Sequence, residues 1–245
     1  MRLVTRTAAL LAVAPLSLAL TACSSGSSSS TSAGAVKPTA SASASPKDPN
    51  TGLATGAQLK AALAPASFFG AGYVVDASAT RDSGPMYQEP SSAPASLAKP
   101  DCTKLGGTSW IAITGDTGVS FAQNDYTNKN TSAEMAQEID VFRGTTAPTV
   151  LTHLKKAVAA CPTLKDEDTK TTAKVKGATT SGLGDEAYTI TVTDPAWENG
   201  STLIAVRRGT AVVTVLSTAG HDNGAASAKK LAAHVAATMG TKAKG

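Results

Sequence analysis

The sequence predicts an α+β fold: an antiparallel β-sheet with helices packed on one face, in a single domain stapled by one disulfide. Three observations lead to this expectation. Several segments alternate apolar and polar residues as strands do, and others repeat apolar residues with a helical period. The strand-like segments come in runs separated by helical ones, which is typical of antiparallel sheets. Cys102 and Cys161 form an even pair beyond the N-terminal segment.

The N-terminal segment predicts export and lipidation. Arg2 and Arg6 precede an uncharged apolar run, Ala8 to Leu20, which is shorter than the roughly 20 residues that a membrane-spanning helix needs. Residues 1–22 are therefore expected to be a cleavable signal peptide. Leu20-Thr21-Ala22-Cys23 matches the lipobox of bacterial lipoproteins, in which the cysteine is acylated. We expect Cys23 to anchor the chain at the extracytoplasmic face of the cell membrane; the alternative is an ordinary secretory signal with a chance cysteine.

The composition separates a linker from a folded domain. Residues 23–52 consist of the cysteine expected to be lipidated and a stretch rich in Ser, Ala, Thr, Gly and Pro, a composition typical of disordered linkers. The globular domain is expected over 53–245. Without residues 1–22 the chain keeps 22 − 2 = 20 Lys+Arg against 18 Asp+Glu. That balance argues against nucleic acid as a partner. Aromatic residues make up only 4%, too few for a stacking platform.

The first half of the domain is predicted to contain a short helix and two strands. Leu59 and Leu63 suggest a helix that Pro65 ends. Glycines and prolines then punctuate an irregular stretch over 66–110, in which a short strand around Gly72 to Asp76 is the one regular element expected. Alternation over 119–126 and again over 133–143 predicts two antiparallel strands.

The second half gives clearer patterns. Apolar residues in 147–160 lie on one helical face, and Tyr188, Ile190 and Val192 alternate with threonines as in a half-buried strand. The β-rich runs 203–207 and 210–216 are separated by Arg208-Gly209, which predicts a tight hairpin with positive φ at the glycine. Apolar spacing over 228–239 predicts a closing helix, with Asn223 or Ser227 as its N-cap.

The remaining cysteines are expected to form a disulfide. An exported chain folds in an oxidising compartment, and lipidation of Cys23 leaves Cys102 and Cys161 as a pair. The alternatives are two unpaired thiols or a pair of metal ligands. No histidine lies near either cysteine in the sequence, which disfavours a metal site.

Several segments together resemble a known family. They are the run Tyr126-Thr127-Asn128, the helix end Ala160-Cys161-Pro162, the segment Gly182-Leu183-Gly184-Asp185-Glu186-Ala187 and the hairpin Val206-Arg207-Arg208-Gly209. Over residues 56–240 the chain resembles actinobacterial lipoproteins related to the PknH-like extracellular sensor domain. The resemblance implies an α+β fold around a cleft and sensing of an extracellular ligand, with no catalytic residues to transfer. Kinase-linked members have two disulfides, whereas this chain allows one.

The motifs predict binding and not catalysis. His153, His221 and His234 are isolated, and the acidic run at 166–168 lacks the spacing of a calcium loop, so we expect no catalytic residue, no metal site, no cofactor and no enzyme activity. Trp197, in a loop between strands, and Arg207, beside the hairpin, are the candidate ligand-binding residues. The alternatives are that Trp197 folds back to cap the core and that the hairpin arginine only keeps the turn soluble.

The expected function is that of a membrane-anchored, extracytoplasmic ligand-binding or sensor-like domain. Its ligand would be a small molecule, a wall polymer or an envelope protein. The alternative is a structural lipoprotein that docks on another envelope protein.

Overall fold

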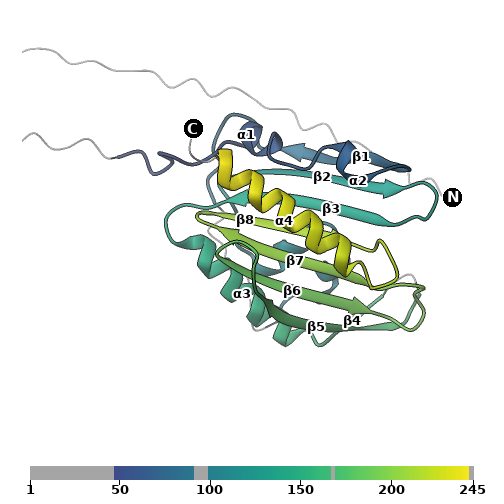
Figure 1. The fold of residues 1–245 in the computed structure, drawn as a ribbon. Helices are drawn as coiled ribbons and strands as arrows, with labels where there is room; N and C mark the ends of the chain where they lie inside the picture. Colours follow the sequence, from purple (N-terminus) through teal and green to yellow (C-terminus); the bar gives the residue numbers. More distant parts are fainter. Residues whose placement is uncertain (1–46, 91–98, 167–168, 243–245) are drawn as a thin grey trace, which may run out of the picture. The chain divides into compact units, whose positions relative to one another are not determined.

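One antiparallel sheet organises the fold (Figure 1). The computed structural model describes residues 47–90, 99–166 and 169–242. The predicted signal peptide, Cys23 and most of the predicted linker lie outside these residues. No helix in the described ranges is long and apolar enough to cross a membrane.

The elements alternate between the sheet and its covering helices. The strands are β1 Tyr73–Asp82, β2 Ser120–Asn128, β3 Glu134–Val141, β4 Thr163–Lys165, β5 Thr172–Thr180, β6 Glu186–Thr193, β7 Ser201–Arg208 and β8 Ala211–Ser217. The helices are α1 Gly56–Lys60, α2 Ala66–Phe69, α3 Thr146–Ala160 and α4 Ala225–Lys242, with short 3₁₀ helices η1 Cys102–Gly106 and η2 Trp110–Thr114.

The strand order is β1-β2-β3-β8-β7-β6-β5-β4. Strands β1 to β3 form one meander and β4 to β8 a second, and the two are joined where β3 pairs with β8. Every neighbouring pair is antiparallel. The pairing of β3 with β8, from Met135 opposite Ser217 to Val141 opposite Ala211, connects the two halves of the chain. The order leaves β1 and β4 as the edge strands.

The helices cover both faces of the sheet. In β7, Ile204 and Val206 pack in one apolar cluster with α1, α2 and α4, whereas Leu203 and Ala205 pack in a second cluster with α3, η1 and η2. Figure 1 shows α4 lying across β7 and β8. The α+β class and the antiparallel sheet are as predicted, but the expectation of helices on one face is corrected. The inner strands are apolar at consecutive positions, so each face must be shielded from water.

The structure lengthens one predicted strand and adds two that the pattern did not predict. The short strand expected around Gly72 to Asp76 is present as β1, which extends to Asp82 and is mostly exposed because it lies at the sheet edge. Strands β4 and β5 were missed entirely. In β5 only Ala173 and Val175 are buried, and the other positions are small or polar, which leaves little hydrophobic alternation to detect.

Local signals explain where several elements begin and end. At α1, Thr55 and Gln58 form a capping box: the Thr55 hydroxyl accepts the Gln58 N–H, and the Gln58 side chain accepts the Thr55 N–H. The β7–β8 hairpin has Gly209 at φ +59°, as predicted. The N-cap prediction for α4 is corrected, because the Asp222 carboxylate accepts the Ala226 N–H at 2.8 Å.

Candidate functional site

A cavity of about 480 Å³ opens where the ends of four strands meet η1. Its volume is within the range of small-molecule sites. Leu164 and Leu216, which belong to the apolar cluster on the α3 face, form its floor. The described lining residues are Thr103, Gly106, Gly107, Glu134, Leu164, Lys165, Asp166, Trp197, Asn199, Gly200, Ser201, Leu216 and Thr218.

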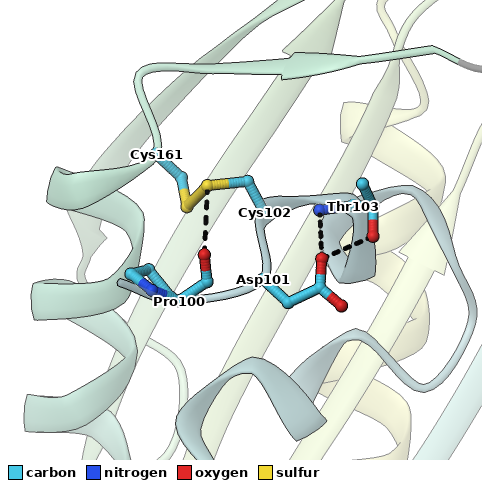
Figure 2. Close-up of a disulfide and its surroundings, with 5 residues drawn as sticks. All are labelled: Pro100, Asp101, Cys102, Thr103 and Cys161. Atoms are coloured by element: carbon cyan, nitrogen blue, oxygen red, sulfur yellow. Dashed lines mark hydrogen bonds between the residues drawn. A yellow bond between two sulfur atoms is a disulfide. The ribbon is translucent and has the colours of Figure 1, made fainter. Parts of the chain in front are cut away.

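The predicted disulfide is present and holds two walls of this cavity together. Cys102 begins η1 and is bonded to Cys161, which follows α3 (Figure 2). Thr103, the residue after Cys102, lines one wall, and Leu164, three residues after Cys161, lines another. The Asp101 carboxylate accepts hydrogen bonds from the N–H and the hydroxyl of Thr103, which start η1 (Figure 2).

Trp197 is placed by contacts with the β4–β5 connection. Its indole N–H donates to the Asp166 carboxylate at 2.6 Å. The Asp194 carboxylate, three residues before the tryptophan, accepts the Thr171 hydroxyl at 2.7 Å and the Ala196 N–H at 2.8 Å. The loop before β7 and the turn after β4 are therefore linked at two points, and Trp197 is partly buried between them.

Asn199 closes the opposite side of the cavity. Its amide N–H₂ donates to the carbonyl oxygens of Thr218 and Gly220, at 2.8 and 2.6 Å, and its oxygen accepts the Asn223 N–H at 3.0 Å. The Asn223 side chain in return accepts the Gly200 N–H at 2.8 Å. This reciprocal pair of hydrogen bonds connects the start of β7 to the segment between β8 and α4. Both N–H groups and the oxygen of the Asn199 amide are engaged in hydrogen bonds within the protein.

Glu134 supplies a carboxylate at the rim. The backbone of Glu134 pairs with Thr218: its N–H donates to the Thr218 hydroxyl at 2.8 Å and its carbonyl accepts the Thr218 N–H at 3.0 Å. Partial removal from water raises the pKa of the Glu134 carboxyl, and the negative charges of Asp125 and Asp76 raise it further. The carboxylate therefore lies in a negative local potential.

The structure separates the two sequence-predicted binding residues. Trp197 lines the cavity, next to the start of β7. Arg207 lies near the other end of the same strand, 3.2 Å from Asp185 and 3.7 Å from Glu186. At that end a smaller cavity of about 210 Å³ is lined by Arg208 and not by Arg207.

The lining also contains residues that the sequence did not single out. Thr103, Glu134 and Asp166 come from three distant segments, and only Asp166 stood out, as part of an acidic run that lacks the spacing of a calcium loop. The other two members of that run, Glu167 and Asp168, lie outside the described residues.

The histidines lie apart from the cavity and from one another. His153 Nδ1 is 2.9 Å from the Asp116 carboxylate, the His234 ring packs against the Phe68 ring at a tilt, and His221 is exposed. In the part of the chain that the structure describes, no group of three or more His, Cys, Asp or Glu residues is arranged to hold a metal ion.

A second polar feature lies on β3, under η2. Glu138 and Asp140 point to the same face of the strand and are 7% and 8% exposed. Burial raises the pKa of Glu138 to about 7, although the nearby Arg81 guanidinium acts in the opposite direction. Burial and the charge of Glu138 raise the pKa of Asp140 well above its usual range. One oxygen of each carboxyl has no hydrogen-bond partner among the described residues.

Comparison with known proteins does not assign the chain to a family. No family model and no curated protein matches the sequence. Among solved structures, the chain is similar to the extracellular domain of PknH from Mycobacterium tuberculosis, with a TM-score of 0.48 and 12% identity. The match covers 77% of this chain and 97% of that domain. At that distance the function of the cavity has to be inferred from its own residues.

Proposed function

We propose that this chain is an exported, lipid-anchored ligand-binding domain, and that the cavity beside Trp197 holds its ligand. The observation that carries the proposal is the cavity itself, which combines an apolar floor with polar groups at its rim. Such a combination is typical of small-molecule sites, where apolar contacts supply affinity and a few polar groups supply orientation.

The disulfide supports two parts of the proposal, the export of the chain and the binding of a ligand in the cavity beside Trp197. A disulfide persists in an oxidising compartment, which agrees with the export signal in the sequence. It also constrains two walls of the cavity before any ligand arrives. Preorganisation of this kind lowers the entropic cost of binding.

The test is to isolate the full-length chain from its native membranes in mild detergent and analyse it by native mass spectrometry. We expect a co-purifying small molecule, and a melting temperature that rises with the concentration of that molecule when it is added back, because a ligand of the native state stabilises it. Trp197→Ala should abolish the rise, whereas Arg207→Gln, at the other end of β7, should keep it. A chain with no bound molecule and no stabilisation by any compound in a broad small-molecule set would contradict the proposal.

A second candidate is docking on an envelope protein through the edge strand β1. Val74 and Val75 are 38% and 50% exposed on this strand, whose pairing partner among the described strands is β2. An exposed apolar edge is a surface to which another chain can add a strand. A photo-crosslinking residue placed at Val75 in intact cells would capture a specific partner under this alternative, while the same residue placed at exposed Lys176 on β5 would not.

A further inference from the structure

The lining of the cavity contains more negative than positive charge. Glu134 and Asp166 are acidic, and Lys165 is the only basic residue among the lining residues described, so the formal charge of the lining is −1. Lys165 is an exposed residue of the edge strand β4. The Asp166 carboxylate already accepts the Trp197 indole N–H and the Thr169 N–H, so Glu134 is the carboxylate that a ligand would meet at this site.

Most of the neutral polar groups in the lining are already used by the protein. The Thr103 hydroxyl donates to Asp101, and the Asn199 amide is fully engaged with backbone groups. The indole N–H of Trp197 donates to Asp166. Since this N–H is the only polar group of a tryptophan, the Trp197 side chain offers a ligand its π-surface and no hydrogen bond.

The Glu134 carboxylate, in contrast, has no hydrogen bond or ion pair to any described residue. It projects on the same face of the sheet as Asp125, which lies opposite Ala136 on the neighbouring strand, and Asp76 lies opposite Asp125 on β1. Three carboxylates on three adjacent strands thus contribute to the potential at the rim. Removal from water is the main cause of the raised pKa of Glu134, and the charges of Asp125 and Asp76 raise that pKa further.

From this arrangement we infer that the cavity is selective for an organic cation, a compact molecule with a protonated amine and an apolar body. The inference rests on the proposed function of the cavity. The ammonium group would donate to the Glu134 carboxylate and lie in the negative field of the acidic strands. The apolar body would contact Leu164, Leu216 and the Trp197 ring, whose π-face also attracts cations. A neutral or anionic analogue would meet the same floor without the ion pair.

The test compares three probes that share one alkyl chain and differ in charge: hexylamine, hexanol and hexanoate. The two tryptophans of the chain give two indole N–H resonances, which Trp197→Phe assigns. Each probe is titrated into the full-length protein at neutral pH and low salt, and the Trp197 resonance is followed while the resonance of Trp110, buried in the core, serves as the internal reference. We expect hexylamine to bind roughly tenfold more tightly than either analogue, as a charge-assisted hydrogen bond provides.

Two matched variants separate the role of Glu134 from a general charge effect. Glu134→Gln should bring the affinities for hexylamine and hexanol to within about twofold of each other, because only the charge and its ion pair are removed. Glu198→Gln removes one carboxylate from the exposed residue next to Trp197, outside the cavity lining, and should keep the preference. An equal effect of both variants would overturn the role of Glu134.

The outcomes distinguish the inference from the function it rests on. If hexanol or hexanoate binds as tightly as hexylamine, the cation selectivity is overturned while the cavity remains a ligand site. If none of the three probes moves the Trp197 resonance, the cavity does not admit a compact organic molecule, and the proposed function fails together with the inference.

Discussion

At the scale of single residues, the buried carboxyl groups on β3 make the strongest prediction about stability. Glu138 and Asp140 are surrounded by the sheet and by η2, and Arg81 is the cation whose charge reaches both. Transfer of a carboxylate from water to such a site is unfavourable, so the proton is retained to higher pH. As the pH rises, ionisation of these groups in the native state lowers the free energy of unfolding.

The stability of the protein should therefore fall between about pH 4.5 and pH 7. Folded Glu138 keeps its proton up to a pKa of about 7, whereas in the unfolded chain it loses the proton near 4.5. In this window the folded state binds more protons, so the free energy of unfolding decreases with pH, by at most about 3 kcal/mol from this group. Urea unfolding measured across the window should show a smaller slope for Glu138→Gln and a gain in its stability at pH 8.

A control removes a carboxyl from the surface. Glu198→Gln, at an exposed position, should unfold with the pH dependence of the wild type. Identical pH slopes for Glu138→Gln and the wild type would show that Glu138 is not protonated in the fold.

Asn199 makes a second prediction at this scale. Its side chain forms three hydrogen bonds that hold the start of β7 against residues 218–223. Asn199→Ala should lower the free energy of unfolding by about 2 kcal/mol, because two carbonyl groups and one N–H lose their partners. The measurement is urea unfolding beside Asn130→Ala, an exposed position at the β2–β3 turn where no loss is expected. Equal stability of the two variants would mean that water replaces the Asn199 amide without cost.

At the scale of secondary-structure elements, the disulfide between η1 and the end of α3 determines the shape of the cavity. η1 is a 3₁₀ helix of only five residues and has little stability by itself. The bond to Cys161 attaches it to α3, which has a buried face of six residues. The cavity wall at Thr103 thereby gains the rigidity of a longer helix.

Removal of the disulfide should affect stability and the cavity together. The bond closes a loop with a sequence separation of 59 residues, for which the chain-entropy model gives about 4 kcal/mol. The double variant Cys102→Ser/Cys161→Ser should lose roughly that free energy of unfolding in urea, and the Trp197 indole resonance should broaden. Cys23→Ser changes the remaining cysteine and should leave both measurements unaltered. An unchanged Trp197 resonance in the double variant would show that the cavity forms without the bond.

At the scale of the whole molecule, the sheet separates the proposed site from the second, smaller cavity. The larger cavity opens at the end of the sheet where β7 begins and β8 ends, and Arg207 and Arg208 lie at the other end of β7. The two ends are connected by strands whose side chains are buried on both faces. Ligand binding at one end is therefore expected to leave the hairpin at the other end in place.

The predicted lipid anchor is tested on intact cells. Cys23→Ser should remove the acylated residue, so the chain should be recovered in the soluble fraction and no longer incorporate labelled palmitate. Ser24→Ala, the next residue along, keeps the lipobox and should remain membrane-bound and labelled. A wild-type chain found only in the soluble fraction would contradict the lipidation of Cys23.

Part of the site was predictable from sequence, and the rest depended on contacts between distant segments. Trp197 stood out because a large aromatic residue in a polar loop is unusual, and it does line the cavity. Glu134 and Thr103 carry no local signal, since a polar residue at a strand start or in an irregular segment is ordinary. They become neighbours only through the pairing of β3 with β8 and through the disulfide.

The sequence alone was enough to predict the α+β class, the strands β2, β3, β6, β7 and β8, the helices α3 and α4 and the disulfide between the two cysteines. These features follow from strong hydrophobic periodicity and from a count of cysteines, which are local properties. The covering of both faces by helices, the full length of β1, the addition of β4 and β5 and the cavity beside η1 depend on the tertiary structure. Strands with one or two buried residues are stabilised by the backbone hydrogen bonds of a neighbouring strand, and that neighbour is specified by the packing of the entire domain.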